Sequence, residues 1–296
     1  MKISLRASNL PLMRLSALRP LILLFCVIHS SAQQPIGTVL TTGPYVGFDI
    51  NDYPGDQALP TLRRHFAFVG YWLNNPPGEP QNSWVGKREV LVRNGFGFLV
   101  LANGRIESEI KKAKRSGTSP ATLGAQDATV AIVAAHRENF ATRTIIFLDQ
   151  EEGGRLTDDQ SSYLLAWTET VASKSGYLPG VYASGQPVND GPGKTITTVQ
   201  HIREQVASRH LHEITIFVYQ DACPPANGCS LQPPSLSASG TPEIAAWQYA
   251  QSPRRKAITA ACSKTYAADG NCYAADLPQL PLDLSVSGSD DPSHGR

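Results

Sequence analysis

The chain has 296 residues, of which 41% are hydrophobic and 17% are charged, and its formal net charge is +1. A chain of this length can bury a large core, in one large domain or two small ones. The near-neutral charge excludes a general nucleic-acid binder, which would carry a strong basic excess, and the apolar content excludes wholesale disorder. We therefore expect a soluble, folded protein without a nucleic-acid partner.

The first 32 residues have the pattern of a secretory signal peptide. They hold four basic residues and no acidic ones, followed by an apolar run over 21–28 and the small residues 30–32. This order is typical of a cleaved signal, and eight apolar residues are too few to span a bilayer. We expect a secreted or periplasmic protein that has no membrane contact after cleavage, with an uncleaved anchor as the alternative. Without this segment 22 basic residues face 25 acidic ones, a net charge of −3.

Short apolar strands alternate with helical patterns after this segment. Apolar, β-branched and aromatic residues predict strands over 45–50, 66–73, 96–101, 144–149, 178–184 and 214–220. Helical patterns lie between them, over about 84–94 and over 121–139, where an Ala- and Val-rich stripe could pack on a sheet.

The clearest helix start is Thr157. Gln160 follows three residues later, which is the spacing of a capping box, and an apolar stripe that includes Tyr163 and Trp167 comes next. Gly176 ends this helix.

The pattern changes after residue 220. Residues 221–242 are rich in Pro, Gly, Ser and Cys and cannot form a helix, yet strands are predicted again over 244–249 and 282–286. Eight strands with about five helical crossovers favour a closed α/β, TIM-like barrel over an open sheet. We expect a linker over 33–43, one barrel domain over 44–286 and a disordered tail over 287–296.

Four cysteines remain after removal of the signal peptide, an even number that suits disulfide bonds in an exported protein. Three pairings are possible, and the short loops favour Cys223 with Cys229 and Cys262 with Cys272. A zinc site is disfavoured because the spacing is not of the CxxC type and no histidine lies nearby in the sequence. His210 and His212 lack a third ligand, so we predict no metal and no cofactor.

Acidic residues mark three strand ends. In a βα barrel, functional residues lie at the carboxyl ends of the strands. Asp49 ends the first predicted strand, Asp149 ends the fourth with Glu151 two residues later on the same side of the chain, and Asp283 lies in the last. A carboxyl group kept protonated by its neighbour's charge can protonate a glycosidic oxygen. The alternative is that these acids cap helices or pair with bases such as Arg155.

Aromatic residues near the other strand ends could stack on sugar rings, although each could equally belong to the core. The candidates are Tyr71, Trp72, Tyr182, Tyr219, Trp247 and Tyr249. Gln220 and Gln248 could add polar contacts.

The order of several short motifs resembles a known family. The motifs are Gly47-Phe48-Asp49, Asp149-Gln150-Glu151, the segments 180–184 and 246–249, and the late Asp283. In this order they resemble the family 25 glycoside hydrolases, the lysozyme-type muramidases. Together with the segment 68–73 they resemble more closely a related bacterial glycoside-hydrolase-like family of unknown function 1906. The resemblance covers about residues 44–286.

The resemblance implies five βα units followed by three strands with few helices. It also implies action on an amino-sugar cell-wall polymer such as peptidoglycan, by a monomer. Glu151 would match the general acid, Asp149 the carboxylate that assists the substrate's own acetamido group, and Asp49 and Asp283 the flanking acids. Two other functions stay open: a non-catalytic module that binds cell-wall carbohydrate in the same cleft, and a purely structural periplasmic protein.

Overall fold

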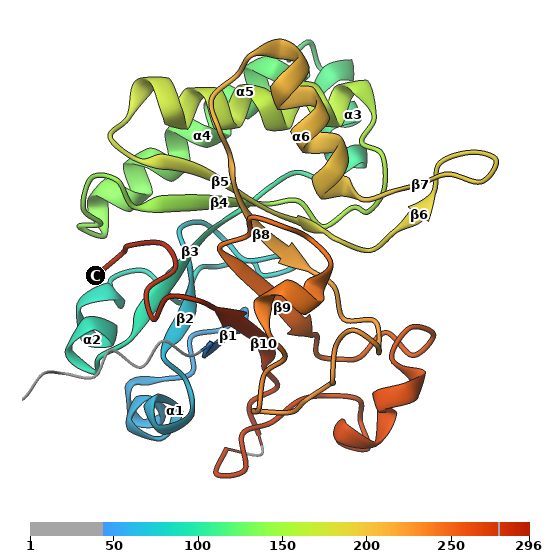
Figure 1. Ribbon diagram of the computed structural model, residues 1–296. Helices are drawn as coiled ribbons and strands as arrows, with labels where there is room; N and C mark the ends of the chain where they lie inside the picture. The colour runs from blue at the N-terminus through green and yellow to red at the C-terminus, as the bar shows by residue number, and fades with distance from the viewer. Residues whose placement is uncertain (1–43, 278) are drawn as a thin grey trace, which may run out of the picture. The chain divides into compact units, whose positions relative to one another are not determined.

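A computed structural model describes residues 44–277 and 279–296, in which eight strands close into a barrel (Figure 1). The predicted signal peptide and linker lie outside these residues. The barrel strands are β1 (Tyr45–Asp49), β2 (Phe68–Trp72), β3 (Gly97–Asn103), β4 (Ile145–Asp149), β5 (Leu178–Ser184), β8 (Thr215–Tyr219), β9 (Ala246–Ala250) and β10 (Asp283–Ser287). The predicted α/β, TIM-like barrel is confirmed.

The direction of β10 determines which of its residues lie at the mouth of the barrel, the end at which the parallel strands finish. The strand order is β1-β10-β9-β8-β5-β4-β3-β2, and β10 runs antiparallel to both of its neighbours while the remaining pairs are parallel. The start of β10 therefore lies where the other strands end. In this register Asp283 is the direct partner of Asp49.

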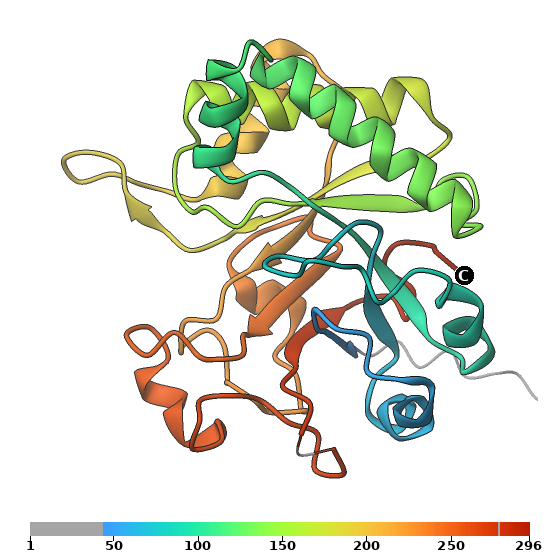
Figure 2. The same ribbon diagram turned by 180° about the vertical axis from the view of Figure 1, so that it is seen from behind.

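Each of β1 to β5 is followed by α-helix before the next barrel strand. The helices are α1 (Leu59–His65), α2 (Arg88–Arg93), α3 (Glu107–Arg115), α4 (Pro120–Arg137), α5 (Asp158–Lys174) and α6 (Thr198–Arg209). Helices α3 to α6 gather beside β4 and β5, and a short hairpin of β6 (Val188–Asn189) and β7 (Thr195–Ile196) precedes α6 (Figures 1 and 2). In the described part of the chain, none of the helices has the length and apolar character that a membrane span needs.

In the residues that the structure describes, the loops after β8 and β9 contain only 3-10 turns, η2 (Leu236–Ser239) and η3 (Ala260–Thr265). A further 3-10 turn, η1 (Asp56–Ala58), precedes α1. The loops after β8 and β9 lie together on the side of the barrel away from α4 and α5 (Figure 2). The Pro- and Gly-rich composition after residue 220 explains why helices are missing here.

Local sequence determines how α5 begins and how closely it approaches α4. Thr157 Oγ1 accepts a hydrogen bond from Gln160 N at 3.3 Å, and Gln160 Oε1 accepts one from Thr157 N at 2.8 Å, which completes the predicted capping box. On α4, a side chain at Gly124 would collide with the carbonyl oxygen of Tyr163 on α5. Glycine therefore allows the two helices to pack closely.

The predicted disulfide pairing is wrong. The bonds join Cys223 to Cys262 and Cys229 to Cys272, so each links the β8–β9 loop to the β9–β10 loop. The two loops are neighbours in space because the strands that they follow, β8 and β9, are paired in the barrel. Spatial proximity of the loops, which spacing in the sequence does not reveal, selects the partners.

The structure also differs from the disordered tail predicted over 287–296. Ser293 N donates to Phe98 O, and Ser293 O accepts from Ile145 N, both at 2.8 Å. Asp291 Oδ1 accepts from Phe98 N at 2.8 Å. The tail thus lies between the starts of β3 and β4, whose own pairing begins only at Val100. Its polar composition hid this role because backbone hydrogen bonds do not require apolar side chains.

Candidate active site

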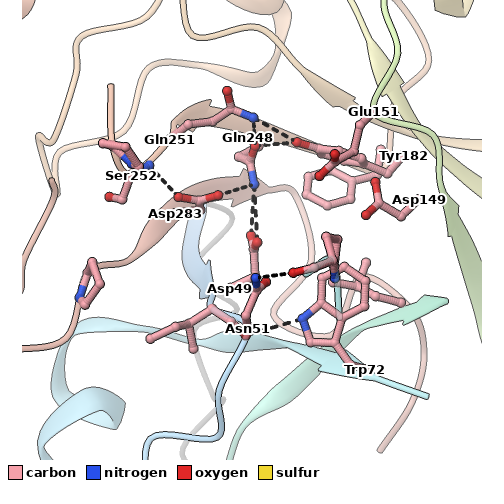
Figure 3. A pocket seen from close by; sticks show the side chains of 16 residues that line it. Asp49, Asn51, Trp72, Asp149, Glu151, Tyr182, Gln248, Gln251, Ser252 and Asp283 are labelled. Atoms are coloured by element: carbon pink, nitrogen blue, oxygen red, sulfur yellow. Dashed lines mark hydrogen bonds between the residues drawn. The ribbon is translucent and has the colours of Figure 1, made fainter. Parts of the chain in front are cut away.

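Four carboxyl groups converge on one cavity at the mouth of the barrel. The cavity measures about 400 Å³ and is lined by Asp49, Asp149, Glu151 and Asp283, together with Trp72, Tyr182 and Gln248 (Figure 3). These residues come from β1, β2, β4, β5, β9 and β10 and from the loop after β4. All four acids expected from the sequence are therefore brought together, in a cavity of the size that binds small ligands.

Gln248 connects two of the carboxylates. Its amide nitrogen donates to Asp49 Oδ2 at 3.1 Å and to Asp283 Oδ2 at 3.4 Å, and its amide oxygen accepts from the Tyr182 hydroxyl at 2.6 Å (Figure 3). Gln248 is only 2% exposed. One buried amide thus holds an acid of β1, an acid of β10 and a tyrosine of β5 in fixed relative positions.

The loop after β9 completes this network. Gln251 Nε2 donates to Gln248 Oε1 at 3.0 Å and to the Tyr182 hydroxyl at 3.2 Å. Ser252 N donates to Asp283 Oδ1 at 2.6 Å. The sequence did not single out Gln251 and Ser252, because they lie in a loop without periodicity; only their place just after a strand end could have drawn attention to them.

Burial and mutual repulsion raise the pKa values of the inner acids. Burial raises the pKa of Asp49 to about 7, against the opposing effect of the hydrogen bond from Gln248. Burial, with the charge of Asp49 next in importance, raises the pKa of Asp283 well above its ordinary value. Burial, followed by the charges of Glu151 and Asp49, does the same to the pKa of Asp149. The cavity therefore retains protons at a pH at which ordinary carboxyl groups are ionised.

Asp149 has a carboxyl oxygen without a partner. The residue is 6% exposed, and its Oδ1 atom is buried and makes no hydrogen bond to any described residue. Buried polar atoms of folded proteins are nearly always hydrogen-bonded. An orphaned oxygen at a cavity wall is therefore suited to accept a hydrogen bond from a ligand.

Glu151 lies at the rim rather than in the depth of the cavity. Its side chain is exposed, and the Tyr219 hydroxyl donates to its backbone oxygen at 2.6 Å, which holds the chain in place after β4. Partial loss of hydration, followed by the charge of Glu152, raises the pKa of Glu151. Glu152 itself turns to α3, where its Oε2 accepts from Glu107 N at 2.8 Å. Glu151 is therefore the acid most accessible to a large substrate.

Tyr182 and Tyr219 belong to the site in different ways. Tyr182 lines the cavity, whereas Tyr219 is not among the lining residues and supports Tyr182, with ring centroids 5.1 Å apart.

Tyr71, Trp247 and Tyr249 are placed away from the cavity, against the sequence prediction. All three are fully buried. Tyr71 OH donates to Trp84 O at 2.7 Å, Trp247 Nε1 to Gln220 O at 2.8 Å and Tyr249 OH to Ser230 O at 2.9 Å. The reason is strand alternation: their neighbours Trp72 and Gln248 face the cavity, so these three side chains face the outer side of the barrel.

The histidine and cysteine candidates for a metal site are used otherwise. His212 Nδ1 lies 2.8 Å from Glu169 Oε2, His210 ends α6 in the left-handed conformation, and the four cysteines form disulfides. Over residues 44–277 and 279–296, no group of three or more His, Cys, Asp or Glu side chains is arranged to hold a metal ion.

Comparison with known proteins identifies related sequences and structures. Residues 66–228 match the family model described as the Rv2525c-like, glycoside hydrolase-like domain. An uncharacterized protein of B. stearothermophilus is 18% identical, with a TM-score of 0.51 over 82% of this chain and 95% of that one. At this identity the likeness shows a shared fold. No curated protein matches the chain.

Two other solved structures are more distant in geometry. The Mycobacterium tuberculosis Tat-secreted protein Rv2525c, in complex with L-tartrate, is 12% identical, with a TM-score of 0.47 over 83% of this chain and 95% of that one. The catalytic domain of endolysin ply40, from bacteriophage P40 of Listeria monocytogenes, is 14% identical, with a TM-score of 0.48 over 86% and 98%.

Proposed function

Because the chain belongs to the Rv2525c-like, glycoside hydrolase-like family, we propose that it is an exported glycoside hydrolase of an amino-sugar cell-wall polymer such as peptidoglycan. The observation that carries this proposal is the convergence of Asp49, Asp149, Glu151 and Asp283 on one cavity at the barrel mouth. Glycoside hydrolysis requires one carboxyl group that donates a proton and a second group that stabilises the positive charge on the sugar.

Glu151 is the general acid in this proposal. Its raised pKa favours the protonated form that a general acid needs, and its position at the rim lets it reach the oxygen between two sugar units. When the bond from the anomeric carbon to this oxygen breaks, the Glu151 proton passes to the leaving oxygen. The resulting Glu151 carboxylate then accepts a proton from the water that attacks the anomeric carbon.

Asp149 assists the acetamido group of the substrate. Its orphaned Oδ1 accepts the N–H of that group, whose carbonyl oxygen attacks the anomeric carbon as the leaving oxygen departs. The attacking water then displaces this carbonyl oxygen from the anomeric carbon and restores the acetamido group. Positive charge then develops on the acetamido group, and a nearby positive charge lowers the pKa of a carboxyl group. The ionised form of Asp149 is thus favoured at the moment when it stabilises this charge.

Asp49 and Asp283 flank the sugar in the depth of the cavity. Gln248 holds both, so they can accept hydrogen bonds from sugar hydroxyl groups at fixed positions. The wall formed by Trp72 and Tyr182 supplies apolar ring faces.

The disulfides support the part of the proposal that concerns export. Cys223–Cys262 and Cys229–Cys272 are of the kind that forms and persists in oxidising compartments outside the cytoplasm. The orphaned oxygen of Asp149 and the accessible Glu151 favour catalysis over carbohydrate binding alone.

The release of reducing ends from purified peptidoglycan tests this function. We expect steady release by the wild-type protein and a loss of at least about 100-fold in Glu151→Gln, which keeps the shape of the side chain but has no proton to donate. Glu204→Gln on α6, a residue that lines neither cavity at the barrel mouth, is the matched control and should retain activity. Equal background rates for wild type and Glu151→Gln would refute catalysis; retained binding to peptidoglycan in that case would favour the non-catalytic module.

A further inference from the structure

A second cavity adjoins the first at the mouth of the barrel. It measures about 580 Å³, and the two cavities share Pro77, Asp149 and Glu151 as lining residues. Its remaining wall comes mainly from the loops after β2 and β3 and from α4. The Asp149–Glu151 pair therefore separates two spaces that a chain of linked sugar units could occupy together.

Gln150 is the residue that most clearly points to a ligand in the second cavity. It follows β4, is only 2% exposed and lines the second cavity but not the first. Its backbone N donates to Tyr182 O at 3.0 Å, whereas its side-chain amide makes no hydrogen bond to any residue that the structure describes. The residue is thus almost completely enclosed, and its amide, which is not among the fully buried atoms without partners, opens into the cavity, where a ligand could bind it.

The charges of the residues that line this cavity disfavour the binding of an anionic ligand. Arg105 donates to Asp127 at 2.8 Å and 3.2 Å and lies 3.8 Å from Glu109. One cation thus faces two carboxylates, before Glu151 is counted. A free carboxylate on the ligand would be repelled, whereas a neutral amide could both donate to and accept from Gln150.

We propose that the second cavity is a binding subsite for a neutral, N-acylated amino-sugar unit and that Gln150 recognises its acylamino group. The inference rests on the proposed function, because the same polymer would cross Asp149 and Glu151 and place neighbouring units in the two cavities. Gln150 then determines which sugar is accepted on the far side of the cleaved bond.

Isothermal titration calorimetry of the full chain tests the subsite. The titrations use Glu151→Gln as the parent, so that no turnover occurs, and two probes of equal length: N-acetylated chitotetraose and cellotetraose, which lacks acetamido groups. Adding Gln150→Met keeps the side-chain volume and removes the amide. We expect the Kd for N-acetylated chitotetraose to rise about 10-fold and that for cellotetraose to stay unchanged.

Two further variants make the result decisive. Gln205→Met on α6, which lines neither cavity, should change neither Kd. Gln150→Glu should also raise the Kd for N-acetylated chitotetraose. Thermal melting shows which of the two Gln150 variants remain folded. Unchanged affinity in a folded Gln150 variant, or no binding of N-acetylated chitotetraose by the parent, would overturn the subsite. Failure of peptidoglycan hydrolysis by the wild type, with Gln150-dependent binding intact, would refute the proposed function alone.

Discussion

Two residues at the barrel mouth have opposite effects on stability: Asp149 destabilises the fold, and Gln248 stabilises the acids beside it. Asp149 keeps a carboxyl group in a buried place where one oxygen has no partner, an arrangement that destabilises the fold. Gln248, by contrast, stabilises two neighbouring acids by donating hydrogen bonds to Asp49 and Asp283. Local features that destabilise a fold are expected at functional sites.

Asp149→Asn should stabilise the protein, and the gain should depend on pH. The pKa of Asp149 is raised in the folded state, so the folded state holds its proton more tightly than the unfolded chain does. As the pH rises above the unfolded value, ionisation in the folded state therefore costs stability, whereas asparagine has no such cost. We expect a Tm increase of about 3 °C at about pH 8, shrinking towards about pH 4, in calorimetry.

Asp159→Asn is the matched control for this measurement. Asp159 accepts from Lys114 Nζ at 2.7 Å on the surface, so its replacement removes an exposed ion pair and no buried charge. A gain for Asp149→Asn that does not change with pH, or a loss at about pH 8, would contradict the effect attributed to burial.

Gln248→Met should alter the pH dependence of hydrolysis as well as its rate. The hydrogen bond from Gln248 lowers the pKa of Asp49, so its removal should raise that pKa above its present value of about 7. Any limb of the pH–rate profile that reports Asp49 then moves to higher pH, and kcat/KM falls about 100-fold. Gln220→Met, which removes a buried amide that bonds only to backbone groups, should leave the profile in place. An unshifted profile in Gln248→Met would contradict the positioning role.

At the scale of elements, the barrel strands follow from the sequence but the loops do not. Apolar runs place all eight strands to within a few residues, and Thr157 marks the start of α5 correctly, because these features depend on neighbouring residues. Whether an aromatic side chain faces the cavity depends on whether its position in the strand points into the barrel or out of it. The closed barrel determines which positions of a strand point inwards, which explains why the sequence alone could not separate Trp72, which lines the cavity, from Tyr71, which does not.

The β8–β9 and β9–β10 loops show the same limit. Their disulfides depend on which loops meet in space, and one of them lies directly behind the site. Cys272 N donates to Ser252 Oγ at 2.9 Å and Cys272 O accepts from Leu282 N at 2.9 Å. Ser252 N in turn donates to Asp283, so the Cys229–Cys272 bond supports a site carboxylate.

Removal of either disulfide should lower the stability of the fold, but the two removals should lower activity to different extents. Each double variant, Cys229→Ala with Cys272→Ala or Cys223→Ala with Cys262→Ala, should lose about 2–5 kcal/mol of unfolding free energy. The first should also lower kcat/KM the more strongly, because it loosens Ser252 and Asp283. Denaturant unfolding and peptidoglycan hydrolysis at a temperature at which both variants are folded provide the comparison. Equal activity losses would contradict a specific link between Cys272 and the site.

At the scale of the whole chain, the antiparallel direction of one strand, β10, assembles the site. Because β10 is antiparallel, an acid at its start joins acids at the ends of β1 and β4. The sequence predicted that these acids belong together through the order of its motifs, but the direction of β10 and the place of the C-terminal tail between β3 and β4 are tertiary features. Backbone pairing between segments almost 200 residues apart, such as Ser293 with Phe98, leaves no periodic pattern to detect.

If the residues at the barrel mouth hydrolyse bonds between amino sugars, the products of digestion must carry new sugar ends. Purified peptidoglycan is incubated with the wild-type protein, the soluble fragments are reduced with borohydride, and their masses are measured. We expect wild-type fragments that end in a newly reduced amino sugar, and none of these in the Glu151→Gln digest. Wild-type fragments without new reduced sugar ends, or cleaved only within peptide bonds, would contradict hydrolysis between amino sugars.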